Sequence, residues 1–396
     1  MDNITHSLVG SAVAQVAYPS EYSPGDRRVF QTLGVLAANL PDIDLVYTGI
    51  TPAPLGYLLH HRGHTHTLAG MLGLGLAVML FCRFVPRVRR LAPPQRARLW
   101  VVVWLNLVGH VSLDALNSYG VHPFYPLDST WYYGDAIFIF EPWVWTILAV
   151  PVIRNAGTRL PRLLTASIVG VLLLAVATLG VVPLAVVVLI VSTGGALFLA
   201  AAYVTPRIAA AVALAAAAGF IAGMIGLSRV ARLESVAAAG GAQGRRIVDT
   251  IVTPDPAVPV CWGVILVLQE GSAELVLRRG TLSLIPARYP PQNCASGRLT
   301  GATAAMPRNG GLVWVDEIRQ PLAALRDLRD RDCWVRAWLE FGRAPIVRGG
   351  AIRDFRFDIG TRRNFTVMSA GHDPAAGCPA NVPGWTMPRG DVLGIP

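Results

Sequence analysis

Residues 60–67 read His-His-Arg-Gly-His-Thr-His-Thr, so four of the eight histidines of the chain fall within seven residues. Neutral imidazole is the commonest protein ligand for zinc and related metals, and a metal site needs several donors that converge. Six further donors lie in the first 122 residues of the chain: His6, Asp42, Asp44, His110, Asp114 and His122. The first third of the sequence therefore predicts a metal site built from segments that are distant in the chain.

The composition is too apolar for a soluble globular protein. Of the 396 residues, 53% are hydrophobic and 15% are charged, whereas about a quarter of the residues of a soluble domain are charged. The apolar character is concentrated before residue 230, and the remainder has an ordinary polar balance. We therefore predict a multi-span α-helical membrane protein with a C-terminal β-rich (α+β) domain outside the membrane.

The net charge of +10 comes entirely from arginine, since the chain contains no lysine. A basic protein that binds nucleic acid carries a basic stripe with interleaved aromatic residues. Here the arginines lie mainly in short loops between apolar segments and in the C-terminal part. In a membrane protein this is a topology signal, so we expect membrane lipid and no nucleic acid among the partners.

A membrane-spanning helix needs about 20 mostly apolar residues. Six stretches fit this requirement, and two weaker ones precede them. The six are 68–84, 99–117, 136–153, 163–182, 184–204 and 207–227, and the weaker two are 4–18 and 29–47. We thus expect about six to eight membrane helices. The N-terminus has no basic leader or cleavage site, so it is not expected to be a removable signal peptide.

Loop charge orients these predicted spans. Arginines gather in the loops at 27–28, 87–98 and 154–162, and the positive-inside rule places these loops in the cytoplasm. The loops at 48–66 and 118–135 hold almost no arginine and are expected outside. With eight spans and the N-terminus outside, the candidate ligands fall toward the outer ends of their helices, and the C-terminal domain is also outside.

The chain divides into three predicted parts. Residues 1–155 form the helical domain that carries the metal site, 156–230 form anchor helices without candidate ligands, and 235–396 form the β-rich domain. In the anchor helices, Gly194 and Gly195 suit close helix packing. Alternating patterns in the last part predict five strands and one short helix. The strands are 260–269, 274–285, 312–315, 333–341 and 351–359, and the helix is 321–331.

Four of the five cysteines, Cys261, Cys294, Cys333 and Cys378, lie in the predicted external domain. An even set in an exported domain predicts up to two disulfides, for which the sequence allows three connectivities. The alternative is a set of unpaired buried cysteines. Cys82 lies inside a predicted span.

Two pairs of residues have informative spacing. His110 and Asp114 are four residues apart, so both side chains leave one helix face. They are either metal ligands or a hydrogen-bonded pair that joins helices.

Asp42 and Asp44 follow Pro41, and in turn backbone they cannot face the same way unless the chain curls around a ligand. One then binds the metal while the other orients a ligand or bridges; the alternative is simple helix-end polarity.

Within 60–67, His61 and His66 are the expected ligands, whereas His60 and His64 are ligands, supporting groups or solvated side chains. Arg62 either holds an anionic group bidentately or forms a salt bridge to a nearby aspartate.

Four polar residues outside that stretch need separate interpretation. Glu141 interrupts an apolar run, where a carboxylate is either a ligand or a general base with a raised pKa; Asp135 is the weaker competitor. His6 is a candidate ligand because of the other histidines, and His372, among turn residues, has no expected role.

Several motifs together resemble a known family. They are 1–10 (MDNITHSLVG), 40–44 (LPDID), 61–67 (HRGHTHT), 110–120 (HVSLDALNSYG) and the Phe-Glu-Pro at 140–142. This order of motifs is similar to that of the YdjM-like inner-membrane proteins, which are described as metal-dependent hydrolases and as LexA-binding. The resemblance implies a multi-pass protein of the bacterial inner membrane. It also implies that seven residues match the family's polar positions: His6, Asp42, Asp44, His61, His66, His110 and Asp114.

The leading hypothesis is a membrane-embedded metallohydrolase with one or two divalent ions, zinc first and manganese or another metal second. Its substrate is expected to be a phosphoester or a lipid-linked molecule at the outer leaflet. Glu141 or Asp44 is expected to act as the base, and Arg62 to hold the anion. The alternatives are a transporter, which needs ligands at several depths, and a non-enzymatic, metal-stabilised membrane protein with a regulatory protein partner.

Overall fold

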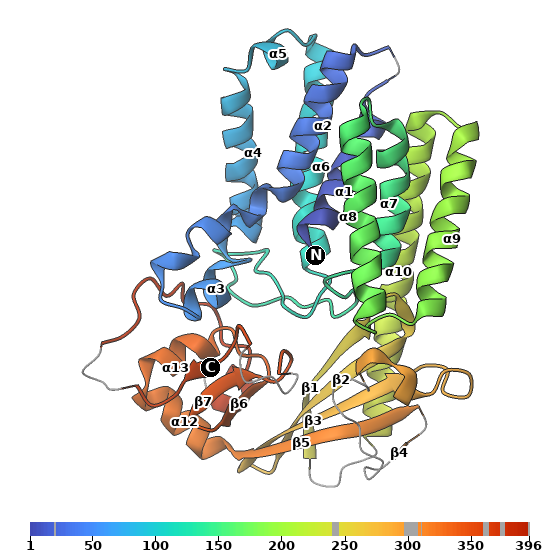
Figure 1. Ribbon diagram of the computed structural model, residues 1–396. Helices are drawn as coiled ribbons and strands as arrows, with labels where there is room; N and C mark the ends of the chain where they lie inside the picture. The colour runs from blue at the N-terminus through green and yellow to red at the C-terminus, as the bar shows by residue number, and fades with distance from the viewer. Residues whose placement is uncertain are drawn as a thin grey trace.

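The computed structural model places a helical bundle at one end of the molecule and the C-terminal domain at the other (Figure 1). It describes residues 1–19, 21–239, 245–296, 308–309, 311–358, 364–372 and 377–394. The long loop between the first and second halves of the bundle, residues 115–141, runs between the bundle and the C-terminal domain. This loop therefore contributes to the junction between the two parts of the molecule.

The first half of the bundle packs its helices closely. Its elements are α1 (Asn3–Ala17), α2 (Pro24–Asn39), the 3-10 helices η1 (Leu40–Val46) and η2 (Thr48–Ile50), α3 (Leu55–His60), η3 (His64–His66), α4 (Leu68–Cys82), α5 (Pro86–Arg89) and α6 (Pro93–Asp114). The side chain of Asp2 caps α1 by accepting hydrogen bonds from the N–H groups of Ile4 and Thr5. A Cβ added at Gly10 would lie 2.6 Å from the carbonyl oxygen of Gly34, so α1 and α2 meet backbone to backbone.

The second half is made of longer and more apolar helices. They are α7 (Pro142–Asn155), α8 (Arg159–Thr178), α9 (Leu184–Ala200), the 3-10 helix η4 (Ala201–Tyr203) and α10 (Pro206–Ala238). The side chain of Thr205 caps α10. This helix runs past the predicted end of its span at residue 227 and continues alongside the C-terminal sheet (Figure 1).

All eight predicted spans contain helix, but the expected six to eight membrane helices are not confirmed. By length and composition, four segments of the described chain are long and apolar enough to cross a membrane: Pro24–Ile50, Arg159–Thr178, Leu184–Tyr203 and Pro206–Ala238. A fifth is possible if Leu55–His66 and Leu68–Cys82, bent by 68°, form one broken span. The predicted span 136–153 becomes helical only from Pro142, and its 14 residues fall short of the about 20 that a span needs.

The C-terminal domain contains two antiparallel sheets. The larger has the strand order β1-β2-β3-β5-β4 and the smaller β6-β7-β8. The strands are β1 (Arg245–Asp255), β2 (Val258–Glu270), β3 (Glu274–Ser283), β4 (Arg308–Asn309), β5 (Leu312–Pro321), β6 (Pro345–Arg348), β7 (Ala351–Asp354) and β8 (Met368–Ser369). Helices α12 (Leu322–Arg331), α13 (Cys333–Leu339) and α14 (Gly390–Leu393) pack with them. The predicted β-rich class is confirmed.

One predicted strand is wrong, and the other four are strands with different bounds: 260–269 is β2, 274–285 is β3, 312–315 is β5 and 351–359 is β7. Residues 333–341 contain helix α13, because Asp332 caps its first turn and the buried Val335, Trp338 and Leu339 follow helical spacing. The predicted strand 312–315 extends to Pro321, and 351–359 ends at Asp354. Strands β1, β4, β6 and β8 were not predicted.

The four cysteines form two disulfides, Cys261–Cys294 and Cys333–Cys378. This settles which of the three predicted connectivities occurs, and it removes the alternative of unpaired cysteines. The first joins β2 to the segment after η5 (Pro291–Asn293), and the second ties α13 to the C-terminal segment.

The C-terminal domain is fastened to the loops at the end of the bundle. The indole N–H of Trp385 donates to the carbonyl oxygen of Leu59 at 2.7 Å, and that of Trp131 donates to the carbonyl oxygen of Glu340 at 2.6 Å. Arg343 forms ion pairs with Asp135 of the loop before α7 and with Asp249 of β1. These buried contacts hold the loops 48–66 and 118–135 in place, and both loops border the polar cluster described next.

Candidate metal centre

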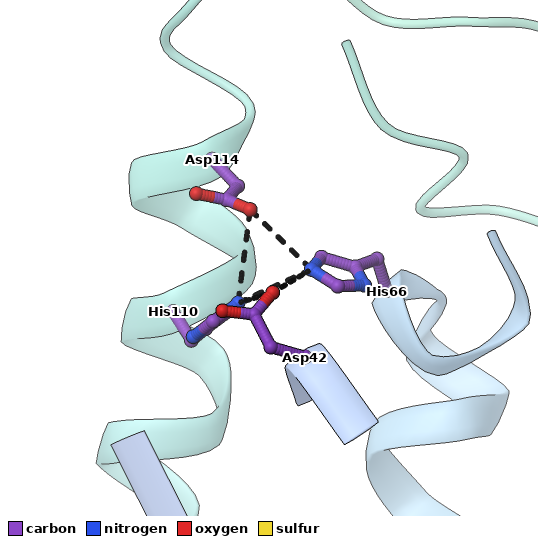
Figure 2. A group of neighbouring side chains, drawn as sticks. All are labelled: Asp42, His66, His110 and Asp114. Carbon is purple, nitrogen blue, oxygen red and sulfur yellow. Dashed lines mark hydrogen bonds and ion pairs between the residues drawn. The ribbon is translucent and has the colours of Figure 1, made fainter. Parts of the chain in front are cut away.

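Four side chains from three distant segments meet at the end of the bundle that faces the C-terminal domain. Asp42 comes from η1, His66 from η3, and His110 and Asp114 from the last two turns of α6 (Figure 2). One ligand atom from each lies within 4.8 Å of the others. His66, His110 and Asp114 are at most 1% exposed, and Asp42 is partly buried. Such burial of two carboxylates requires compensating positive charge.

The shortest approach in the cluster joins two imidazole nitrogens. Nε2 of His66 lies 3.1 Å from Nε2 of His110. Oδ1 of Asp42 lies 3.6 and 3.4 Å from these two nitrogens, and Oδ2 of Asp114 lies 3.3 and 3.7 Å from them. All four atoms therefore surround one small volume.

The hydrogen bonds behind the two rings fix their tautomers. Nδ1 of His110 lies 2.7 Å from the carbonyl oxygen of Ala38, which only accepts, so this nitrogen carries a proton. Nδ1 of His66 lies 3.1 Å from Oδ2 of Asp44, also an acceptor, so it carries a proton too. In the neutral rings both Nε2 atoms are then bare lone pairs that face each other and two carboxylates. A cation between them resolves this conflict, and the residues present therefore fit a metal ion.

Asp44 lies behind this cluster rather than in it. Its side chain is fully buried and accepts hydrogen bonds from the backbone N–H of Arg62 at 2.9 Å and the hydroxyl of Thr65 at 2.8 Å. Its oxygens also lie 3.1 Å from Nδ1 of His61 and from Nδ1 of His66. Asp44 thus shapes the turn at 61–66 and orients two of its imidazoles.

A second group of donors adjoins the first and shares Asp42 with it. Ligand atoms of Asp42, Asp44 and His61 lie within 4.8 Å of one another. The tight 3-10 backbone of η1 brings the two carboxylates this close, as predicted for a chain that curls around a ligand. The arrangement therefore accommodates one ion at the four-residue cluster and has donors for a second beside it.

Arg62 is buried against the cluster. Its backbone has φ of +61°, a left-handed conformation unusual for a residue with a side chain. Its Nε lies 2.9 Å from Oδ2 of Asp114, Nη1 donates to Asn117 at 2.7 Å, and the guanidinium lies 5.0 Å from the ring centroid of Tyr119. The salt bridge to an aspartate, one of its two predicted roles, is thus formed, and it offsets part of the negative charge of the site.

The first helix supplies two more neighbours. The ring of His6 stacks on that of His110 with centroids 3.8 Å apart, and its Nε2 lies 3.2 Å from Oδ1 of Asp114. Asn3 donates to Oδ2 of Asp42 at 2.6 Å, which leaves Oδ1 of that carboxylate for the cluster. Sequence reasoning missed Asn3, although its position three residues before His6 places both on one helix face.

Other candidates from the sequence lie apart from the cluster. The Glu141 carboxylate caps α7 through the N–H of Trp143 and accepts from the N–H of Ala257 in the turn between β1 and β2. His60 bonds to Thr51, and the exposed His64 lies against the rings of Tyr125 and Trp385.

Two further histidines lie away from the cluster and pack against aromatic rings or an aspartate. His122 stacks on Trp385 and contacts the ring of Trp131, and burial lowers the pKa of His122 to about 3. His372 lies 3.0 Å from Asp332 in the C-terminal domain. A third group of possible metal donors in the described chain, Asp255 with Cys261 and Cys294, offers no thiolate because its cysteines form a disulfide.

The part of the chain that carries the cluster is similar to a known protein family. Residues 1–189 match the family described as "YdjM inner membrane protein". The predicted resemblance to the YdjM family is confirmed. The matching YdjM region contains every residue of both donor groups around Asp42. Together with the apolar helices, it supports a membrane location.

One curated relative is similar over part of the chain. The chain is 28% identical over 163 residues to the uncharacterized protein YfhP of Bacillus subtilis (strain 168), covering 40% of this chain and 47% of YfhP. The chain therefore spans about half the length of the curated relative that it matches. No solved structure matches the chain significantly.

Proposed function

We propose that this protein is a multi-pass, membrane-bound, metal-dependent hydrolase that cleaves a phosphoester, lipid-linked or otherwise amphipathic, at the outer leaflet. The observation that carries the proposal is the convergence of two imidazole lone pairs and two carboxylates in a buried volume. Two bare imidazole lone pairs beside two carboxylates do not stabilise helix packing unless a cation lies between them. Buried ionisable groups of this kind in a membrane protein are typical of a functional site.

Asp42, His66, His110 and Asp114 would hold the first ion, with zinc favoured by the mixed nitrogen and oxygen donors and manganese as the other candidate. Asp44 and His61 would hold a second ion and share Asp42 with the first. A divalent ion in such a site lowers the pKa of a water molecule and stabilises negative charge on a leaving oxygen. Four donors suffice for one ion, so a single ion is the simpler arrangement.

The surrounding residues have positioning roles in this proposal. Asp44 fixes the rings of His61 and His66, and Asn3 turns Asp42 toward the cluster. Arg62 balances Asp114, and its contacts leave it less free to hold a substrate anion than the sequence alone indicates. Glu141 lies with α7 and the β1–β2 turn, so we no longer assign it the role of base.

The surface beside the site supports an amphipathic substrate. On η1, the segment that carries Asp42 and Asp44, and on the following η2, four apolar side chains are exposed by 43 to 84%: Ile43, Leu45, Val46 and Ile50. Exposed apolar side chains gathered next to a polar site are typical of contact with lipid or with an apolar ligand. A substrate with an acyl or isoprenoid chain could thus approach along η1 while its phosphate enters the cluster.

The proposal is tested by metal content and hydrolysis in the detergent-purified full-length protein. We expect one or two equivalents of a transition metal in the wild type. The variants His66→Ala and His110→Ala should lose it, while His64→Ala, a matched control in the same segment, should retain it. Hydrolysis of bis(p-nitrophenyl) phosphate and of a long-chain phosphoester should fall by about 10²-fold or more in the two site variants. Metal that is retained in both would overturn the site assignment.

Metal without any phosphoester hydrolysis would instead favour the non-enzymatic, regulatory alternative. The outer-leaflet placement has a separate test, a fusion of a periplasm-active reporter to the C-terminus. Activity of the reporter is the expected result, and an inactive periplasmic reporter beside an active cytoplasmic one would reverse the orientation.

A further inference from the structure

At one end of the helices α7 to α10, the charged side chains are all positive. Residues 142–233 contain no aspartate or glutamate. Four arginines of this stretch lie at the end of the bundle that points away from the C-terminal domain (Figure 1): Arg154, Arg159, Arg162 and Arg207. Within the described part of the chain, no ion pair involves any of the four. Their charge is therefore left to be balanced from outside the protein.

Three of these arginines also lie at positions where the protein itself disfavours positive charge. Arg159 and Arg162 lie in the first turn of α8, and Arg207 in the first turn of α10. The N-terminus of a helix carries a partial positive charge and favours anions, so arginine is unfavourable there. The loop-charge rule explains a basic end in general, but it does not explain why two of the side chains converge on a cavity.

That cavity has a volume of about 360 Å³ and is lined by Arg154, Asn155, Arg162, Phe198, Val204 and Pro206. The Arg154 guanidinium lies 5.7 Å from the centroid of the Phe198 ring. Nε of Arg162 donates to the carbonyl oxygen of Ile153 at 3.2 Å. Each guanidinium carries five N–H donors, so both retain donors for an anion inside the cavity.

An apolar cavity adjoins this basic one. Its volume is about 160 Å³, and Val204 lines both cavities. Its other walls come from α7, α9, η4 and α10, including Val150, Leu197, Ala200 and Ala216. A basic pocket that borders an apolar slot between helices matches the two parts of a phospholipid, an anionic headgroup and an acyl chain.

We propose that this end of the bundle binds one anionic phospholipid, with its phosphate on Arg154 and Arg162 and one acyl chain in the apolar cavity. Because α8, α9 and α10 are long and apolar enough to cross a membrane, the basic cavity lies at a membrane surface. The site is at the opposite end of the bundle from the metal centre, and the inference does not depend on metal binding or hydrolysis.

The test measures lipid bound to the detergent-purified full-length protein by native mass spectrometry. Dioleoylphosphatidylglycerol is the probe, and dioleoylphosphatidylcholine and inorganic phosphate are the comparisons. We expect one tightly bound phosphatidylglycerol, weaker phosphatidylcholine and weaker free phosphate. The double variant Arg154→Gln/Arg162→Gln should weaken phosphatidylglycerol by about 30-fold, since each arginine near a lipid phosphate contributes about a factor of five or more.

Two matched controls separate the site from general charge and packing. Arg159→Gln/Arg207→Gln removes the same charge from the same end but from side chains that do not line the cavity, so its effect should be clearly smaller. Ala216→Phe fills the apolar cavity and should weaken the lipid but not phosphate, whereas Ala215→Phe, its neighbour outside the cavity wall, should not. An unchanged melting temperature shows that each variant is folded. Equal losses in both arginine pairs, or phosphate binding as tight as the lipid, would overturn the proposal.

Discussion

The two halves of the helical bundle bury different kinds of side chain. Helix α6 buries Asn106, His110 and Asp114, whereas the buried residues of α9 are Val187 and Ile190. Ionisable groups inside a membrane protein are costly, and they persist where partners or a cation compensate for them. The first half therefore depends on matched charges, while the second half depends on the fit of small and apolar side chains.

The largest effect that follows from this difference is expected at Asp114. This carboxylate pairs with Arg62, with His6 and with the amino group of Met1, all of them buried. Asp114→Asn leaves the Arg62 charge without its carboxylate, and breaking a buried pair in this way costs about 3–5 kcal/mol. We expect a large fall in the melting temperature together with loss of bound metal.

The matched control for that variant is Asp128→Asn, a partly exposed aspartate that bonds to Thr130 and Tyr132 in the loop before α7. It should change stability by less than about 1 kcal/mol, as is usual for an exposed polar residue. If both variants lose the same stability, the first half of the bundle does not depend on its buried charge, and the contrast with α8 to α10 fails.

An intermediate effect is expected at Glu340, where the C-terminal domain meets the loops of the first half. Its carboxylate accepts the N–H groups of Gly384 and Trp385, and burial raises the pKa of Glu340 to about 7. The carboxyl group of Glu340 thus binds its proton more tightly in the folded protein than in the unfolded chain, where its pKa is near the ordinary value of 4.5. Stability must therefore fall as the pH rises from about 4.5 to 7, by about 3 kcal/mol.

Glu340→Gln keeps the acceptor oxygen and removes the titration, so the variant should lose this part of the pH slope. Hydrogen exchange of the intact protein at pH 5 and pH 7 measures where the change occurs. We expect the wild type to lose protection at 48–66 and 118–135 with rising pH, and α8 to α10 to stay unchanged. A slope of the same size in the variant would exclude Glu340 as its source.

Much of the polar first half could be predicted from the sequence, because metal-binding residue types are recognisable by their identity and spacing. Histidines crowd into 60–66, and the four-residue spacing of His110 and Asp114 requires a shared helix face. The structure brings His61, His66, His110 and Asp114 close to Asp42, whereas His60 and His64 lie apart. The pattern of hydrophobic residues also predicted the helices, since long apolar runs leave few other conformations in a membrane.

The parts that the sequence did not predict depend on backbone geometry or on distant contacts. The 3-10 turns of η1 decide that Asp42 enters the cluster while Asp44 supports His61 and His66. The left-handed backbone of Arg62 turns its side chain toward Asp114. In the C-terminal domain, the apolar positions of residues 333–341 fit both the helical and the strand period, because the run is short. The carboxylate of Asp332, which caps the first turn, favours the helix. The number of membrane spans depends on the surrounding membrane as well as on hydropathy.

The smallest predicted effect tests the apolar half, at two adjacent glycines of α9. A Cβ at Gly194 would lie 2.6 Å from Cγ2 of Thr146 on α7, whereas a Cβ at Gly195 would meet nothing within 4 Å. Gly194→Ala should therefore cost about 1–2 kcal/mol through overpacking. Gly195→Ala should gain about 0.5–1 kcal/mol, because alanine loses less backbone entropy in a helix.

Melting temperatures of the two single variants, measured in the same detergent, should thus move in opposite directions. Both proteins should retain their metal, because α9 carries no donor of the cluster. Two equal shifts would mean that α9 does not pack on α7 at Gly194. A loss of metal in Gly194→Ala would mean instead that the two halves of the bundle are coupled, with the fit of α9 on α7 transmitted through α1 to the carboxylates and imidazoles at the far end of α6.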